Sequence, residues 1–286
     1  MPKQGFLLGL LLVVLAPAGL AQPGIIVVGL NVRYDNPADG ANAWPQRLPL
    51  IRQYMEAVTP DILGVQEALH HQLLDLLEVL PGYDYVGSGR DDGLLGGEFS
   101  PVLFREDRFE LVRQGQFWLS ETPGVPGSIG WEAVLPRVVA WAELRNRSDG
   151  QAFYVFNTHF SHVSDLARRF SMELLSAQVH AIAGENPVVL TGDFNIRKGS
   201  ALYQDMAVHL ASKNGLFNAE GVARHAKNGP GATYNAFGKD GDHGTIDFIF
   251  VSGHFDVLTF QADEVLHKGV FISDHWPVRT RLLLKN

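Results

Sequence analysis

The stretch Pro187–Asn195, which reads PVVLTGDFN, joins a short apolar run to two side chains that could act on a water molecule. Residues 188–191 are apolar or β-branched and precede a glycine, which is typical of a short buried strand. If the chain stays extended beyond Gly192, Asp193 and Asn195 leave the same face of the strand end. A carboxylate beside a carboxamide can orient a water, accept its proton and donate to a developing oxyanion. The alternative is a simple turn, because Gly, Asp and Asn are common turn residues.

Several other expected strands also end in polar side chains. In chain order, the polar residues at strand ends are Asn31, Glu67, His159, Asp193, Asn195, Asp247, Asp274 and His275. Oxygen ligands with few histidines and no cysteine suit a hard cation such as Mg²⁺ or Mn²⁺, and not a structural zinc. Magnesium takes one or two carboxylates plus substrate phosphate, so Glu67 with Asn31 or Asp274 nearby would be enough. The chemistry that this set predicts is metal-assisted hydrolysis of a phosphoester.

Two strand, helix, strand units are expected to position these side chains. A connection of this kind makes its two strands parallel, and their carboxyl ends then meet at one sheet edge, where α/β sheets bind ligands. The order therefore predicts an α/β fold with an internal repeat. The first unit is expected at Ile25–Arg33, Trp44–Val58 and Asp61–Glu67, and the second at Phe153–Phe160, Ser164–Ala183 and the strand of PVVLTGDFN.

The rest of the chain supplies further strands, two helices and three polar or glycine-rich loops. Strands 137–144 and 153–160 are expected to form a hairpin around Asp149-Gly150, a common hairpin dipeptide. The other expected strands are 82–86, 98–105, 245–251 and 278–284; the helices are 70–80 and 200–210; the loops are 87–97, 117–131 and 228–242.

The polar loop Gly87–Gly97, which reads GSGRDDGLLGG, and three arginine-containing segments raise the question of substrate contacts. Each has an ordinary explanation, because surface turns and ion pairs that hold loops use the same residue types. Both readings stay open at this stage. The substrate-binding candidates are Arg90, Asp91, Glu98, Arg137 and Arg168.

The N-terminus and the composition bear on where the protein works. In residues 1–21, Lys3 precedes an apolar run from Phe6 to Leu15 and small residues follow, a pattern that predicts a secretory signal peptide cut near Gln22. The run is shorter than a membrane span needs. Residues 22–286 are expected to form one domain, secreted or periplasmic, and stable without disulfides since cysteine is absent. A net charge of −8 disfavours a dedicated nucleic-acid-processing role.

The motifs NVR, QE, NTHF, GDFN, IDFIF and SDHWPV, in this order, resemble the endonuclease/exonuclease/phosphatase superfamily, which is DNase I-like. The resemblance runs from Ile25 to the C-terminus and is closest to secreted bacterial members that carry GRDDG and FWLSETP. It implies a four-layer α/β sandwich, in which two mixed β-sheets pack face to face with helices on both outer faces. The internal repeat inferred above agrees with the two pseudo-symmetric halves of that fold.

The resemblance also implies a role for each matching side chain. Glu67 matches the metal-binding glutamate and Asn31 the asparagine that supports it. Asp193 matches the aspartate that positions or deprotonates the attacking water, and Asn195 the residue that orients the phosphate. The remaining matches are His275 at the scissile phosphate, Asp247 orienting its imidazole, Asp274 beside the metal or imidazole, and His159 near the leaving-group side.

Three functions remain open. The first is a Mg²⁺- or Mn²⁺-dependent phosphoesterase that acts on a phosphorylated small molecule or a lipid-linked phosphoester. The second is an extracellular nuclease, which a basic groove with aromatic side chains would favour. The third is a catalytically silent binding domain on the same scaffold, which the complete set of catalytic side chains argues against. The sequence does not determine the oligomeric state.

Overall fold

The computed structural model describes residues 24–226, 229–241 and 243–285. The expected signal peptide, residues 1–21, lies outside these ranges. In the part of the chain that the structure describes, no helix is both long and apolar enough to cross a membrane.

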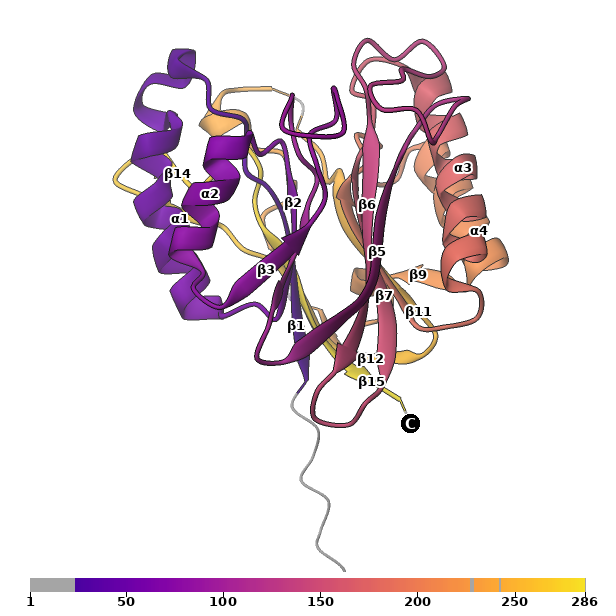
Figure 1. The fold of residues 1–286 in the computed structure, drawn as a ribbon. Coiled ribbons are helices and arrows are strands. Elements are labelled where there is room, and N and C mark those ends of the chain that lie inside the picture. Colours follow the sequence, from indigo (N-terminus) through magenta and orange to yellow (C-terminus); the bar gives the residue numbers. More distant parts are fainter. Residues whose placement is uncertain (1–23, 227–228, 242, 286) are drawn as a thin grey trace, which may run out of the picture.

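Two large β-sheets form the centre of the molecule (Figure 1). The seven-stranded sheet has the order β10 (His225–Ala226), β12 (Phe255–Ala262), β15 (Val278–Leu284), β1 (Ile25–Asn31), β2 (Ile62–Gln66), β4 (Val102–Arg105) and β3 (Tyr83–Val86). The six-stranded sheet has the order β5 (Phe109–Trp118), β6 (Val138–Asn146), β7 (Ala152–His159), β8 (Val188–Asp193), β11 (Asp247–Ser252) and β9 (Leu216–Asn218). Each mixes parallel and antiparallel pairs.

Helices cover the outer face of each sheet, so the molecule has four layers (Figure 1). Helices α1 (Trp44–Val58) and α2 (His70–Val79) lie on the seven-stranded sheet, and α3 (Asp165–Ala183) and α4 (Ala201–Asn214) lie on the six-stranded sheet. The expected four-layer α/β sandwich is confirmed. The short elements are α5 (Ala219–Val222), the 3₁₀ turns η1 (Pro37–Asn42) and η2 (Ala236–Gly238), and the small pair β13 (Leu266–His267) and β14 (Val270–Phe271).

The two sheets approach closely at their centre, where a glycine is required. A Cβ on Gly64 of β2 would lie 2.1 Å from Thr191 Oγ1 of β8, so no larger residue fits there. Around this point Asn157 Nδ2 donates to the carbonyl oxygens of Val65 (2.6 Å) and Pro101 (2.9 Å). Thr191 Oγ1 in turn donates to Asn157 Oδ1 at 2.8 Å. These bonds satisfy buried polar groups and hold the sheets in register near the site.

The register of the two expected repeats is confirmed. Strands β1 and β2 are parallel with Asn31 opposite Gln66, and β7 and β8 are parallel with His159 opposite Asp193. Strand β11 then runs antiparallel to β8 and places Asp247 beside Asp193. The ends of three adjacent strands therefore carry His159, Asp193 and Asp247 side by side.

Some local expectations were wrong. Strands β5 and β12 were not anticipated, because many of their residues are only partly buried and neither has a clear apolar alternation. The strand expected at 98–105 begins only at Val102, and β11 begins at Asp247 instead of continuing through it. The chain does not stay extended after Asp193, because Asn195 adopts a left-handed conformation with φ 50°.

Candidate functional site

A cavity of about 590 Å³ opens at the edge where the strand ends meet. Its lining includes six of the eight residues singled out at strand ends: Glu67, His159, Asp193, Asn195, Asp274 and His275. The other two, Asn31 and Asp247, are buried behind it and contact the lining residues directly. The structure therefore brings all eight residues together.

The side-chain amide of Asn31 links the two halves of the site. Its Nδ2 donates to Glu67 Oε1 at 2.9 Å and to Asp193 Oδ2 at 3.0 Å. Its Oδ1 is occupied by the backbone N–H of Arg33 at 2.9 Å, and the other Glu67 oxygen accepts from the N–H of Tyr34 at 3.1 Å. Since Asn31 turns its nitrogen toward both carboxylates, it orients them, which matches the supporting role that the resemblance implies.

Asp193 is almost completely buried at the end of β8 and lies close to most of the other residues of the site. Its Oδ1 accepts the backbone N–H of Asn195 at 2.9 Å, which the left-handed conformation of Asn195 makes possible. Its Oδ2 lies 3.5 Å from His159 Nε2 and 3.7 Å from His275 Nε2. Burial, and then the nearby negative charge of Asp247, raise the pKa of Asp193 to about 7. A carboxylate with such a pKa is suited to accept a proton near neutral pH.

His275 and Asp247 form a buried pair next to Asp193. His275 Nδ1 donates to both Asp247 oxygens, at 2.9 and 3.1 Å, which leaves Nε2 on the cavity side. Burial alone would lower the pKa of His275, but the charges of Asp247 and Asp193 outweigh it and raise that pKa well above its ordinary value. The imidazole is therefore cationic at neutral pH and can donate from Nε2 to an anion in the cavity.

His159 is a second buried imidazole with the opposite character. Its Nε2 accepts from Asn195 Nδ2 at 3.0 Å, and the same amide nitrogen donates to the carbonyl oxygen of Phe160 at 3.1 Å. Burial, and then the positive charges of Arg137 and Arg90, lower its pKa well below the ordinary value, so the ring is neutral. The proton then resides on Nδ1, which is buried and has no hydrogen-bond partner among the described residues.

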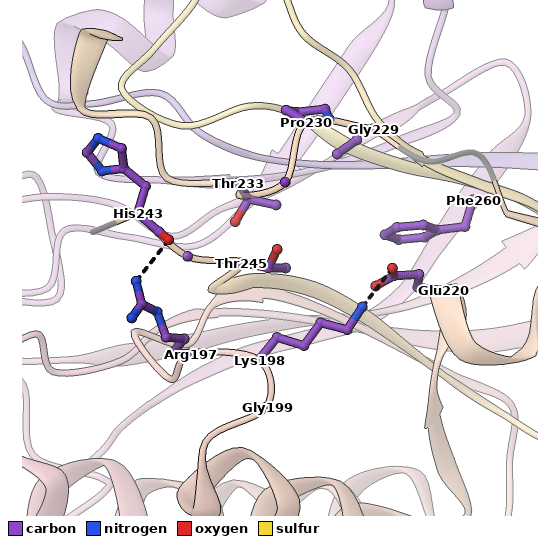
Figure 2. A pocket seen from close by; sticks show the side chains of 13 residues that line it. Arg197, Lys198, Gly199, Glu220, Gly229, Pro230, Thr233, His243, Thr245 and Phe260 are labelled. Carbon is purple, nitrogen blue, oxygen red and sulfur yellow. Dashed lines mark hydrogen bonds and ion pairs between the residues drawn. The ribbon is translucent and has the colours of Figure 1, made fainter. Parts of the chain in front are cut away.

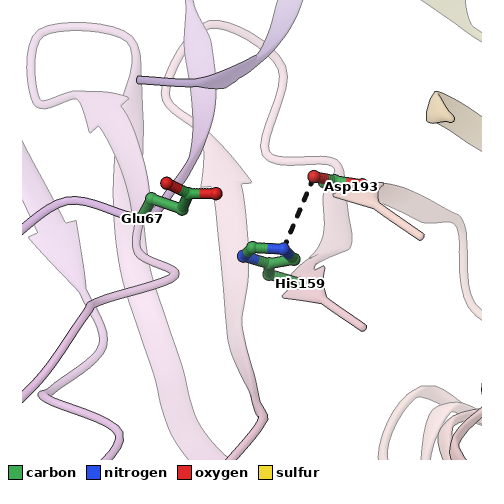
Figure 3. A group of neighbouring side chains, drawn as sticks. All are labelled: Glu67, His159 and Asp193. Carbon is green, nitrogen blue, oxygen red and sulfur yellow. Dashed lines mark ion pairs between the residues drawn. The ribbon is translucent and has the colours of Figure 1, made fainter. Parts of the chain in front are cut away.

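Glu67, His159 and Asp193 have the donor set that a divalent cation needs (Figure 3). One ligand atom from each lies within 4.8 Å of the others. The two carboxylates suit Mg²⁺ or Mn²⁺, whereas the lone pair of His159 Nε2 already accepts from Asn195 Nδ2. A second group, Asp193 with Asp247 and His275, has similar spacing, but two of its members already bond to each other. The residues present fit a cation at Glu67.

Asp274 lies in the cavity wall on the side of Arg33. Its Oδ2 is 3.8 Å from Arg33 Nε, and its Oδ1 accepts from Ser273 Oγ at 3.2 Å. Burial is the main reason that the pKa of Asp274 is raised. Asp274 was expected to lie with Glu67 at the metal. In the structure, the residues whose side-chain atoms cluster with Glu67 are His159 and Asp193.

Three residues with a clear place at this edge were not singled out from the sequence. Arg33 and Tyr234 line the cavity, and the Tyr234 ring packs 5.1 Å from that of His275. Arg47 is fully buried in α1 and donates to four backbone carbonyl oxygens, those of residues 32, 33, 42 and 272. It thereby ties the segment after Asn31 to the segment before Asp274. The sequence signal that could have identified Arg47 is its place on the apolar side of the expected helix, where an arginine is unusual.

The five substrate-binding candidates divide between the cavity and its surroundings. Glu98 and Arg137 line the cavity. Arg90 lies behind Glu98 and binds both of its oxygens, while Asp91 is half exposed beside Arg90. Arg168 is not among the lining residues; it pairs with Asp165 and donates to the carbonyl oxygen of Ser161 at 2.7 Å.

A second cavity, of about 640 Å³, contains none of the residues singled out from the sequence (Figure 2). Its basic side chains are engaged: Lys198 Nζ pairs with Glu220 at 2.7 Å, and Arg197 donates to the carbonyl oxygen of His243 at 2.8 Å. Its polar groups do not converge on a shared point with perturbed acids and bases, so we place the chemistry in the cavity around Asp193.

The chain is similar to known proteins over most of its length. Among solved structures, the chain is similar to an endonuclease/exonuclease/phosphatase from Bacteroides vulgatus, with 36% identity, a TM-score of 0.85 and coverage of 92% of this chain and 99% of that one. It is also similar to a mannosyl-6-phosphatase from Bacteroides thetaiotaomicron, with 35% identity, a TM-score of 0.82 and coverage of 91% and 100%.

Among curated proteins, the chain is 26% identical over 275 residues to nocturnin of Drosophila melanogaster. The match covers 83% of this chain and 41% of that relative, so the chain spans less than half of the relative's length. The model of the Endonuclease/Exonuclease/phosphatase family matches residues 28–275, which include all eight residues singled out at strand ends. The chain therefore belongs to the Endonuclease/Exonuclease/phosphatase family, whose members hydrolyse phosphoester bonds and generally depend on a divalent metal.

Proposed function

We propose that this protein is an exported, Mg²⁺- or Mn²⁺-dependent phosphoesterase that acts on a phosphorylated small molecule or a lipid-linked phosphoester. The single observation that supports this most strongly is the arrangement around Asp193. A buried carboxylate with a pKa near 7 lies between a neutral and a cationic imidazole and is joined through Asn31 to Glu67. Such a set combines a base, a donor to phosphate and a ligand for a hard cation.

The chain's own residues divide the work as follows. Asp193 orients the attacking water and accepts its proton, because it is the group with a perturbed pKa at the centre of the cavity. His275 donates from Nε2 to a phosphate oxygen, and Asp247 fixes its ring and preserves its charge. Asn195 donates from its amide to His159 Nε2 and so fixes the position of this ring. The two carboxylates and the two imidazoles are buried, so their effect on a bound phosphate is weakly screened.

Glu67 would hold the cation, with Asn31 fixing the position of its Oε1. A bound Mg²⁺ or Mn²⁺ would supply Lewis-acid stabilisation of charge on the phosphate oxygens. Asp193 offers a carboxylate oxygen within 4.8 Å of a Glu67 oxygen and so adds a second ligand of the kind that such an ion prefers.

Two observations support a small or lipid-linked substrate over nucleic acid. The net charge is −8, which opposes the binding of a polyanion. One solved structure of similar sequence is a mannosyl-6-phosphatase, so phosphorylated sugars are the first compounds to test. The nuclease reading remains an outcome of the same experiment.

Export is part of the proposal and rests on the sequence of residues 1–21. Expression of the full chain in a bacterial host, followed by fractionation and N-terminal sequencing, tests it. We expect an exported protein that begins near Gln22. An unprocessed chain that stays in the cytosol would contradict export while leaving the enzymatic proposal standing.

A substrate screen of the purified protein tests the enzymatic proposal. Phosphosugars, lipid-linked phosphoesters, aryl monoesters and diesters, duplex DNA and RNA would each be incubated with Mg²⁺, with Mn²⁺ and with EDTA. We expect metal-dependent release of phosphate or alcohol from the small or lipid esters. Degradation of nucleic acid with no turnover of smaller esters would establish the nuclease instead, and inertness toward every class would favour a silent binding domain.

A further inference from the structure

Arg137, the residue immediately before β6, is a buried cation that has no carboxylate partner among the described residues. It is 4% exposed and lines the cavity around Asp193. Its Nη2 donates to His162 Nδ1 at 2.9 Å, but among the described residues its Nε and Nη1 have no hydrogen-bond partner. Buried charges are normally paired and hydrogen-bonded, so an unpaired guanidinium in a cavity wall indicates a missing anion.

Glu98, which lines the same cavity as Arg137, does not provide that anion. Both oxygens of Glu98 are bound by the guanidinium of Arg90, one through Nη1 and the other through Nη2 at 2.9 Å. Burial lowers the pKa of Arg137 to about 10, which still leaves it cationic at pH 7. The positive charge of Arg137 is therefore available to a ligand.

Two loops pack on each other around Arg90, the residue that binds Glu98. Trp118 is buried and its Nε1 donates to the carbonyl oxygen of Arg90 at 2.7 Å. A Cβ on Gly93 would lie 3.2 Å from both Pro126 and Trp118, so the loop after β3 and the loop after β5 are in contact. These contacts anchor Arg90, which keeps Glu98 bound and unavailable to Arg137.

We propose that Arg137 binds a terminal oxygen of the substrate phosphate and thereby makes this enzyme selective for phosphomonoesters over phosphodiesters. The inference rests on the proposed function. A monoester has three terminal oxygens and carries close to two negative charges at neutral pH. A diester has two terminal oxygens, one charge and a second substituent. The unpaired guanidinium of Arg137 suits the extra oxygen and the extra negative charge of the monoester, both of which the diester lacks.

Paired kinetics test the proposal. Wild type, Arg137→Met and Arg137→Lys would be assayed with metal at pH 8 on p-nitrophenyl phosphate and on bis(p-nitrophenyl) phosphate. We expect Arg137→Met to lower kcat/KM for the monoester by about 10²-fold, the usual effect of removing one preorganised donor. The diester should lose far less, and Arg137→Lys should recover part of the monoester activity because it restores the charge. Equal losses on both esters, or no loss on the monoester, would overturn the proposal.

A binding measurement separates this inference from the enzymatic proposal. Inorganic phosphate would be titrated in EDTA while Tm is followed, since a ligand that binds the folded state raises Tm. We expect a dose-dependent rise for wild type and for Arg145→Met, a control that removes an exposed arginine paired with Glu110. Arg137→Met should show no rise but should retain cooperative unfolding. If phosphate stabilises Arg137→Met as much as wild type, the proposal is wrong, whether or not the protein hydrolyses any ester.

Discussion

Asp247→Asn is the substitution that most directly tests how the site is organised. Asp247 is 2% exposed, His275 is 4% exposed, and the imidazole Nδ1 donates to both carboxylate oxygens at 2.9 and 3.1 Å. Asparagine has nearly the same shape and keeps one acceptor oxygen, so the ring should remain close to its place. The substitution removes the negative charge that counteracts the burial of the imidazolium.

The expected magnitude follows from that loss of charge. Burial lowers the pKa of His275, and Asp247 is the first of the charges that raise it. Without Asp247 the ring loses its proton more readily, and its Nε2 no longer donates to a phosphate oxygen. A preorganised donor to a developing charge contributes about 3–4 kcal/mol, so kcat should fall by roughly 10²–10³-fold. KM should change much less, because the donor acts most strongly on the transition state.

The assay is steady-state turnover of the best substrate from the screen, with circular dichroism and Tm as checks of folding. Asp256→Asn is the matched control, because Asp256 pairs with Arg224 in a half-exposed position outside the residues lining the cavity. We expect wild-type kcat for this control. If Asp247→Asn keeps kcat within a few-fold of wild type while folding normally, or if the control loses as much, the reasoning about the His275 charge is refuted.

Three further predictions concern the metal, the base and the scaffold. EDTA should abolish activity and Mg²⁺ or Mn²⁺ should restore it, and Glu67→Gln should raise the metal concentration for half-maximal activity; an unchanged titration would remove Glu67 from the metal site. Asp193→Asn should lower kcat by roughly 10²–10⁴-fold with the fold intact, and adding His275→Ala should lower it by much less than the product of the single effects; full multiplicativity would show that the two groups act independently. Arg47→Met leaves four backbone carbonyl oxygens without their donor. The free energy of unfolding, measured by urea titration, should fall by roughly 3 kcal/mol or more. An unchanged urea midpoint would show that these bonds add no stability.

The sequence by itself determined the layered α/β architecture and the set of candidate catalytic side chains. Strand, helix, strand order requires parallel pairs, because a right-handed crossover is the one short path back to the sheet. That rule placed Asn31 near Glu67 and His159 beside Asp193 without any structural information, and the register confirms both. Residue types decided the chemistry, since carboxylates, amides and imidazoles at strand ends have few other common purposes in this combination.

Only the tertiary structure decided the states of these groups. Asp193 and His275 have ordinary side chains, and their shifted pKa values arise from burial and from neighbours that are far apart in the chain. The sequence could not distinguish Arg137 from Arg168 as a substrate contact, whereas the fold buries the first in the cavity wall and pairs the second with Asp165. The left-handed turn at Asn195 was equally hidden, because its backbone conformation depends on hydrogen bonds to Asp193 and Phe160.

The strands β5 and β12 show the same limit at the level of secondary structure. Strand β5 is exposed along much of its length and lies at the edge of its sheet, and β12 carries a bulge between Val257 and Thr259. Hydrogen bonds to a partner strand stabilise each of them. Strand β5 pairs with β6, and β12 pairs with β15 near the C-terminus. The local pattern of apolar residues does not reveal which strands pair. The pairing can be identified only in the assembled sheets.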